Sequence, residues 1–110
     1  MTPLDFKRIA EQFGTPLYIY ETEKIRENLS AIIKFITYPK NKVYYAAMCN
    51  NQPEILKIIK ELGLGVQVNT DHELNLAKEA GFNSSDISFT STGVSRELMK
   101  NSFPHYSLRI

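Results

Sequence analysis

Apolar residues in this chain follow a helical period in some stretches and form short continuous runs in others. The first helical stretch begins at Thr2 and Pro3, because threonine caps a helix and proline suits its first turn. Gly14 is expected to end it. Its apolar stripe is Leu4, Ile9, Ala10 and Phe13. Residues 16–20, which are rich in tyrosine and isoleucine, predict a short strand.

The middle of the chain predicts a helix, a strand and a further helix. The helix covers residues 22–36, and its apolar positions fall on a single face: Ile25, Leu29, Ile32, Ile33 and Ile36. Residues 43–48 are continuously apolar, which predicts a strand buried on both faces, as in a parallel sheet. Pro53 then opens the next helix, and Gly63 is expected to stop it.

Two similar units follow. Residues 65–69 predict a strand, and Thr70 with Glu73 has the spacing of a capping box for a helix that Gly81 ends. Residues 86–90 predict another strand, and a helix is expected from about 95 to 100. The last five residues, 106–110, are compatible with one more strand.

The repeated spacing of these units indicates the fold. Predicted strands begin at Val43, Gly65 and Ile87, an interval of 22 residues each time (43 to 65 and 65 to 87). Strand–helix repeats imply parallel strands joined by right-handed crossovers. We therefore predict an α/β fold with three to four βα units, a partial (β/α)8-type barrel, since a closed one takes about 250 residues. Open edges favour cover by a second copy, so a homodimer is expected.

Composition excludes several classes of protein. The chain has 110 residues, of which 43% are hydrophobic and 23% charged, an ordinary globular balance. Its 13 basic and 12 acidic residues do not cluster, so no nucleic-acid surface is expected. No apolar run is long enough to predict a membrane span. A single cysteine, Cys49, excludes an internal disulfide and favours the cytoplasm.

Three segments carry a resemblance to a known family. Residues 14–20 read Gly-Thr-Pro-Leu-Tyr-Ile-Tyr, and residues 45–56 read Tyr-Ala-Ala-Met-Cys-Asn-Asn-Gln-Pro-Glu-Ile-Leu. Residues 62–68, followed by 73–74 and 80–82, continue the pattern in the right order. Together they resemble the N-terminal, cofactor-binding barrel of the diaminopimelate, ornithine and arginine decarboxylases, the alanine-racemase-like barrel group. Diaminopimelate decarboxylases are the nearest, the resemblance spans nearly the whole chain, and residues 1–110 are expected to form the N-terminal part of such a barrel domain.

The resemblance implies pyridoxal phosphate as cofactor, an amino acid as substrate, and decarboxylation as reaction. It places cofactor contacts at Ala46, Met48, Asn50 and Gln67. The family's Schiff-base lysine falls on Met48, and a thioether cannot form a Schiff base. The acidic residue of the following strand falls on Gln67, and a lysine of a later motif falls on Val94. The family's phosphate-binding glycine loop, its C-terminal β-domain and its catalytic cysteine have no counterpart here.

Two functional hypotheses follow. In the first, the chain is the N-terminal part of a decarboxylase-like barrel and, with no catalytic residue of its own, is not catalytic alone. In the second, it is a non-catalytic binding or assembly module with the same fold. In a third hypothesis the chain is still an enzyme, and Lys42 or Lys57 serves as the Schiff-base amine, although neither lies at the carboxyl end of a strand. Asn50 and Asn51 lie in a strand-to-helix loop, where a site role and a structural role are equally expected.

The remaining candidates have plain structural interpretations. Cys49 is expected to be a packed thiol rather than a reactive one. His72 is expected to be an exposed residue of a first helical turn, and His105 a loop residue without a partner. The spacing of these residues gives no metal-binding signature.

Overall fold

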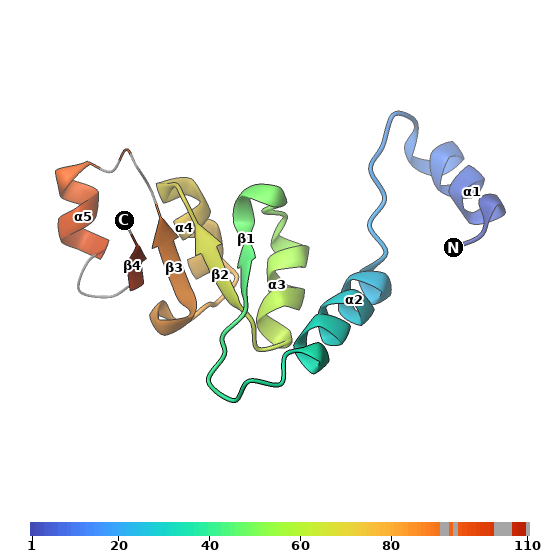
Figure 1. Cartoon of the computed structure of the whole chain (residues 1–110). Coiled ribbons are helices and arrows are strands. Elements are labelled where there is room, and N and C mark those ends of the chain that lie inside the picture. The colour runs from blue at the N-terminus through green and yellow to red at the C-terminus, as the bar shows by residue number, and fades with distance from the viewer. Residues whose placement is uncertain (91–92, 94, 103–106, 110) are drawn as a thin grey trace.

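A four-stranded parallel sheet organises the computed structural model, which describes all residues except 91, 92, 94, 103–106 and 110 (Figure 1). The strands lie in chain order, each hydrogen-bonded to the next: β1 (Tyr44–Ala46), β2 (Gly65–Val68), β3 (Ile87–Thr90) and β4 (Ser107–Arg109). Consecutive strands that are parallel need a crossover helix between them. The structure therefore confirms the α/β fold and the repeated βα units.

Five helices accompany the sheet in the described part of the chain. They are α1 (Pro3–Phe13), α2 (Thr22–Phe35), α3 (Pro53–Glu61), α4 (Asp71–Glu79) and α5 (Arg96–Ser102). Two short 3-10 turns also form, η1 (Ala47–Cys49) and η2 (Ser84–Asp86). The strand predicted over residues 16–20 was wrong, because this extended segment pairs with none of the four strands. β-propensity without a neighbouring strand does not make a sheet.

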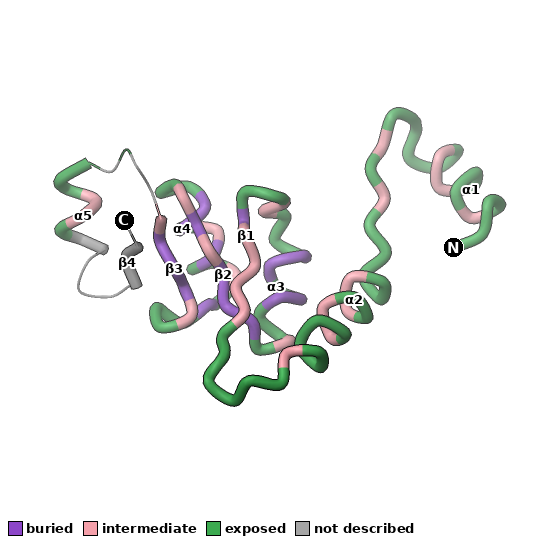
Figure 2. The backbone as a smooth tube through the Cα atoms, viewed as in Figure 1, coloured by how far each residue is buried: buried purple, intermediate pink, exposed green. Residues whose placement is uncertain are grey.

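The core lies between one face of the sheet and the helices behind it (Figure 2). Val66, Val68 and Ile87 are fully buried on this face, and Phe89 is 1% exposed. Their helical partners are Leu56, Ile59, Leu74 and Ala77. The opposite face carries Tyr44, Ala46, Gln67 and Ser88, as the strand alternation and register require.

Burial of β1 on both faces was a wrong prediction. All three of its residues are only half buried, because the helices cover one face of the sheet and β1 is its edge strand. None of the described helices is long and apolar enough to cross a bilayer.

Helix α1 and the segment that follows it extend away from the sheet, whereas Ile25 and Leu29 of α2 pack against the core (Figure 1). Neither α1 nor α2 contains a buried residue. The radius of gyration is 16.8 Å, whereas a compact chain of this length has about 13 Å. The shape is therefore elongated, with apolar side chains of α1 and of the end of α2 exposed to solvent.

Helix α1 depends on its N-terminal cap. Thr2 and Asp5 form the two reciprocal bonds of a capping box. Replacing Thr2 by alanine should lower the helix content of residues 3–13, since an isolated helix of 11 residues is marginal and a cap contributes about 1 kcal/mol. Backbone ¹³C chemical shifts measure this content. Thr22→Ala is the matched control, because α2 starts without a side-chain cap bond.

Acidification should have the same effect on α1. The main-chain N–H and the hydroxyl of Thr2 donate to the Asp5 carboxylate and lower the pKa of Asp5. A lowered pKa means that this contribution is complete at neutral pH and is lost as the pH falls below about 4. The chemical shifts of residues 3–13 should therefore lose helical character in that range. An unchanged helix at pH 2 would contradict the role of Asp5.

Candidate functional site

The carboxyl ends of β1, β2 and β3 bring polar side chains together on the face of the sheet that no helix covers. Ala46 is in register with Gln67, and Gln67 is in register with Ser88. Two residues further along, Asn69 and Thr90 continue the same rows. In parallel α/β folds, ligands bind at this edge of the sheet. The arrangement is therefore a candidate binding site made of neutral polar groups.

Asn69 lies between the three strand ends. Its side-chain nitrogen lies 3.3 Å from the sulfur of Met48, and its side-chain oxygen accepts a hydrogen bond from the Gln67 amide. If the Asn69 amide is turned by half a rotation, its nitrogen instead lies 2.8 Å from the main-chain oxygen of Thr90. The second orientation is the better donor arrangement, since a carbonyl accepts more strongly than a thioether. In both orientations Asn69 joins β2 to a neighbouring strand end, through Met48 in the first and through Thr90 in the second.

Glu73 fixes the loop that carries Asn69. The Glu73 side chain is buried, and its carboxylate accepts a hydrogen bond from the main-chain nitrogen of Asn69 at 2.7 Å. The Glu73 main-chain nitrogen donates to the hydroxyl of Thr70 at 3.2 Å. The predicted capping box is thus only half correct. Thr70 caps α4, but the Glu73 carboxylate accepts from the main-chain nitrogen of Asn69 and not from that of Thr70. This contact holds the turn between β2 and α4 in place.

Met48 lies in η1, the turn that follows β1, rather than in the strand. Its neighbour Ala47 is 1% exposed and anchors the turn in the core, whereas the Met48 side chain is 67% exposed. The packed thiol expected at Cys49 was wrong, because the cysteine is exposed. His72 is exposed in the first turn of α4, as predicted. His105 and Val94 lie outside the described residues.

Asn50 makes its contacts away from this site. The Tyr45 hydroxyl donates to the main-chain oxygen of Asn50 at 3.0 Å, and the Asn50 side chain accepts from the Gln52 nitrogen at 3.1 Å. Burial raises the pKa of Tyr45, which keeps its hydroxyl protonated as a donor. These bonds shape the turn that leads into α3. The structure therefore places Met48 and Gln67 beside Asn69, and the described hydrogen bonds of Asn50 lie within its own turn.

The side chains at this edge do not fit a Schiff-base cofactor. Met48, Gln67, Asn69, Ser88 and Thr90 are all neutral, and none is an amine. Pyridoxal phosphate, when bound to an enzyme, supplies an electron sink and is held through a lysine and through donors to its phosphate. Among the described residues, this edge offers no lysine for a Schiff base, and the one cationic residue in register with it is Arg109, the last residue of β4, which pairs with Thr90.

Lys42 is at the opposite end of the sheet. It precedes β1, its ammonium group pairs with Asp86, and it donates to the main-chain oxygen of Ser85 at 3.0 Å. The hydrogen bond to Asp86 raises the pKa of Lys42, so the amine stays protonated and is a poor nucleophile. The other alternative, Lys57, is an exposed residue of α3. The geometry therefore argues against Lys42 as the amine of a Schiff base.

At the amino end of the sheet face that no helix covers, the ring of Tyr44 packs over Gly65. A Cβ atom on Gly65 would lie 2.5 Å from the Tyr44 ring and 2.9 Å from the main-chain oxygen of Asp86. The ammonium group of Lys42 is 5.5 Å from the centre of this ring, a cation–π arrangement. A ligand on this face would therefore meet polar groups at the carboxyl end and a packed ring at the other.

A parallel sheet covered by helices on one side, with polar strand ends on the other, defines a piece of a (β/α) barrel with its site at the usual edge. Residues 22–105 match the family model described as "Pyridoxal-dependent decarboxylase, pyridoxal binding domain". This match covers more than half of the chain. The chain belongs to the pyridoxal-dependent decarboxylase family, through its N-terminal barrel domain.

Curated relatives agree with this family. The chain is 36% identical over 90 residues to a diaminopimelate decarboxylase of Aquifex aeolicus, which covers 82% of this chain and 21% of the relative. It is 39% identical over 80 residues to the diaminopimelate decarboxylase of Bacteroides thetaiotaomicron, and this match covers 72% of this chain and 21% of the relative. The chain thus spans about a fifth of the length of these relatives.

Solved structures show the same fold. A crystal structure of a protein from Aquifex aeolicus superposes with a TM-score of 0.86 and 30% sequence identity. The match covers 96% of this chain and 26% of the Aquifex chain. A diaminopimelate decarboxylase from M. jannaschii, in co-complex with L-lysine, matches 94% and 26% with a TM-score of 0.85 and 26% identity. The described sheet is therefore a fragment of the decarboxylase barrel.

Sequence reasoning missed four residues of the polar edge and its support: Asn69, Glu73, Ser88 and Thr90. A signal for three of them was present, because polar residues occupy alternate positions 67 and 69, and again 88 and 90. Alternation places such residues on one face of a strand. Glu73 had no such signal, since a capping-box glutamate is expected to bond its own helix cap.

Proposed function

We propose that this chain is the N-terminal portion of a pyridoxal-phosphate-type decarboxylase barrel and that it forms no Schiff base itself. The observation that supports this is Met48, whose thioether lies at the carboxyl end of β1 and contacts Asn69. In the family motif that residues 45–56 resemble, the cofactor lysine falls on this position. The reaction of the whole family member would be the decarboxylation of an amino acid of the diaminopimelate type, in the cytoplasm.

The cofactor positions at Ala46, Met48, Asn50 and Gln67 are part of the same proposal. Gln67 replaces the family's acidic residue and is neutral, so it cannot act as an ionised partner. Asn50 uses its described hydrogen bonds within its own turn. What remains at the ends of β1, β2 and β3 is a set of neutral groups, none of which can form a Schiff base. We therefore expect weak binding of pyridoxal phosphate or none.

A borohydride experiment tests the proposal. The chain is incubated with pyridoxal phosphate at micromolar concentrations and reduced, and the modified lysines are located by mass spectrometry. We expect no lysine that labels saturably, only the slow background of exposed lysines. Met48→Leu is the matched control of similar volume. A saturable adduct on Lys42 or Lys57 would overturn the proposal and restore the enzyme hypothesis.

Restoring the lysine tests how far the site has diverged. In Met48→Lys we expect residue 48 to label no faster than other exposed lysines, because the groups beside it at the ends of β2 and β3 are neutral. The reason is that an aldimine in water is weak unless the protein holds the rest of the cofactor. Saturable labelling of Met48→Lys would mean that the site lacks only the lysine and that the rest of the pocket can still hold the cofactor.

The second candidate is a non-catalytic binding or assembly module. The observation that favours it is the open sheet, whose β1 edge and helix-free face lack a covering layer among the described residues. A second copy placed against this face would give a homodimer and would protect the edge. Residue-specific solvent protection at Ala46 and Gln67 that rises with protein concentration would support this candidate; unchanged protection would oppose it.

A further inference from the structure

The side-chain amide of Asn69 has surroundings that fix which of its two terminal atoms faces each neighbour. One terminal atom lies 2.8 Å from the main-chain oxygen of Thr90 and 3.3 Å from that of Val68. The other lies 3.3 Å from the sulfur of Met48. Carbonyl oxygens repel an amide oxygen and attract an N–H group, so the nitrogen of Asn69 belongs beside Thr90 and Val68.

The amide of Gln67 has to follow this orientation. Gln67 contacts the same end of Asn69 that faces Thr90. Two N–H₂ groups cannot hydrogen-bond to each other, so Gln67 places its oxygen there and accepts. The oxygen of Asn69 is then left beside the sulfur of Met48, and a thioether has no proton to donate. In this orientation no hydrogen bond from a described residue reaches the Asn69 oxygen.

We infer that Asn69 is a specificity-determining residue, whose side-chain oxygen accepts a hydrogen bond from a primary ammonium group of a ligand at the end of β1. The inference rests on the proposed function, because it requires a ligand site at this edge without a Schiff-base lysine at position 48. A polar group that stays unpaired in a complex lowers affinity, so a free acceptor favours a ligand that donates. A carboxylate placed there would face a second acceptor instead.

Charge near Asn69 favours a cationic donor. The buried Glu73 carboxylate accepts a hydrogen bond from the main-chain nitrogen of Asn69 at 2.7 Å, so a negative charge lies close to the proposed acceptor. Arg109 is in register with Thr90, and its main chain is two strands from that of β2, a separation of about 10 Å. A cation at the Asn69 oxygen is therefore attracted by Glu73 at short range, and an anion there is repelled by it.

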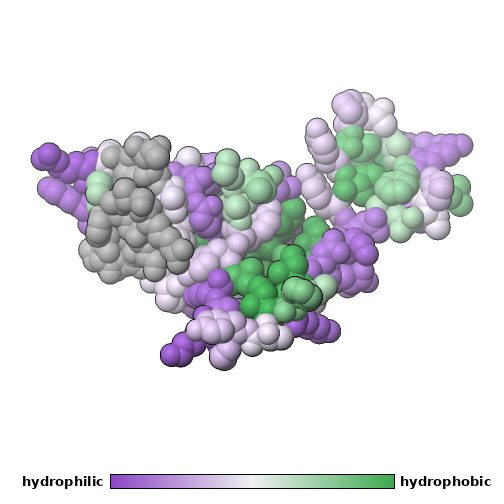
Figure 3. All heavy atoms as spheres, viewed as in Figure 1, coloured by the Kyte–Doolittle hydropathy of each residue, from purple (hydrophilic) through white to green (hydrophobic). Residues whose placement is uncertain are grey.

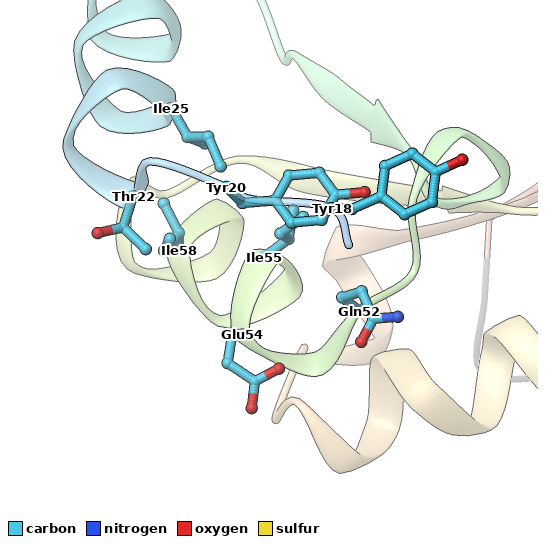
Figure 4. A pocket seen from close by; sticks show the side chains of 8 residues that line it. All are labelled: Tyr18, Tyr20, Thr22, Ile25, Gln52, Glu54, Ile55 and Ile58. Atoms are coloured by element: carbon cyan, nitrogen blue, oxygen red, sulfur yellow. The ribbon is translucent and has the colours of Figure 1, made fainter. Parts of the chain in front are cut away.

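This acceptor is separate from the apolar surfaces of the chain. In Figure 3 the most apolar atoms gather on α1 and beside α2, away from the carboxyl ends of β1 and β2. A hollow of about 510 Å³ between the segment 18–22 and α3 carries the rings of Tyr18 and Tyr20 above Ile55, and Asn69 does not line it (Figure 4). The contacts that orient Asn69 lie within the ends of β1, β2 and β3, so they do not depend on what covers these surfaces.

Nuclear Overhauser effects in the whole ¹³C,¹⁵N-labelled chain test the orientation. We expect cross-peaks from the side-chain amide protons of Asn69 to protons of Thr90, and slow solvent exchange of the proton that the Thr90 oxygen accepts. Thr90→Val is the matched control, because it keeps the main-chain oxygen and should leave these signals in place. Stronger cross-peaks to the methyl group of Met48 would put the nitrogen beside the sulfur and overturn the inference, without touching the proposed function.

Titration with three small ions tests the class of ligand. Methylammonium, tetramethylammonium and acetate are added to the ¹⁵N-labelled chain at constant ionic strength, and the Asn69 side-chain signals are followed. We expect saturable shifts with methylammonium alone, because tetramethylammonium has the same charge but no N–H group, and acetate offers only acceptors. A saturable response to acetate, an equal response to tetramethylammonium, or no saturable response to methylammonium would overturn the inference.

A variant assigns the response to Asn69. Asn69→Ala should raise the half-saturating methylammonium concentration about tenfold, measured on the Thr90 main-chain amide, through loss of one charge-assisted hydrogen bond. Asn83→Ala should bind like wild type, because Asn83 is exposed and caps η2 without a side-chain hydrogen bond. Circular dichroism checks both folds, and the wild-type titration decides if Asn69→Ala unfolds. An unchanged midpoint in folded Asn69→Ala overturns the inference, whereas a saturable borohydride adduct on Lys42 or Lys57 overturns only the proposed function.

Discussion

Replacing Gly65 by alanine should destabilise the sheet by about 3 kcal/mol. The reason is steric, since the new Cβ would lie 2.5 Å from the Tyr44 ring and 2.9 Å from the main-chain oxygen of Asp86. The ring can turn aside, but the backbone oxygen belongs to the turn before β3 and cannot move without the strand. Urea denaturation followed by circular dichroism measures the loss in the free energy of unfolding.

Two further variants test whether the loss comes from the contacts of the new Cβ and how much of it is due to the Tyr44 ring. Gly93→Ala is the matched control, because a Cβ there meets nothing within 4 Å, and its stability should change by less than about 0.5 kcal/mol. Tyr44→Val in the Gly65→Ala background removes the ring but not the Asp86 oxygen, so we expect partial recovery only. Wild-type stability of Gly65→Ala would show that the ring does not cover this position.

The helices could be predicted from the sequence because each carries its own signals. Thr2, Pro3 and Pro53 mark helix starts, and the glycines at 14, 63 and 81 follow helix ends with positive φ angles of 81°, 74° and 84°. These signals act within one or two turns, so they need no knowledge of the fold. The parallel order followed from the regular spacing of strands and helices.

The errors arose where context decides the structure. Residues 16–20 have the composition of a strand, yet a strand forms only where a neighbour can hydrogen-bond to it. The run at 43–48 ends as a 3-10 turn, because Ala47 is drawn into the core while Met48 is left exposed. A continuous apolar run does not tell which residue points inward, and so the burial of β1 was misjudged.

The candidate site could be predicted only in part. The sequence alone indicates that Met48 and Gln67 end neighbouring strands. It does not indicate that Asn69, 21 residues after Met48, reaches the Met48 sulfur or that Glu73 holds Asn69 from behind. Such contacts depend on side-chain reach across a strand end, which spacing does not encode.

The two faces of the sheet have different consequences for function. Its helix-covered face holds the apolar core, and its open face holds the polar edge at one end and the Tyr44 ring at the other. The fold therefore does not depend on Met48 or Gln67, since neither side chain belongs to the core. We infer that stability and cofactor chemistry are separable in this chain, and variants at the two faces should show this.

Phe89→Ala should be the most destabilising single change in the core. The Phe89 ring is 1% exposed and packs with residues of α4 and the neighbouring strand. Removing a buried phenylalanine ring costs about 3–5 kcal/mol, which is a large part of the 5–15 kcal/mol that stabilises a typical domain. The variant should therefore lose most of its folded population in dilute urea, and the loss should appear in circular dichroism as a lower urea midpoint.

Phe35→Ala is the matched control for this prediction. The Phe35 side chain is 89% exposed near the end of α2, so its removal deletes the same atoms without leaving a cavity. Its effect should stay within about 0.5 kcal/mol. If Phe35→Ala destabilised the chain as much as Phe89→Ala, the exposed end of α2 would have to be packed in solution, against a second copy or another layer. In that case the stability of wild type, and not of Phe35→Ala, should rise with protein concentration.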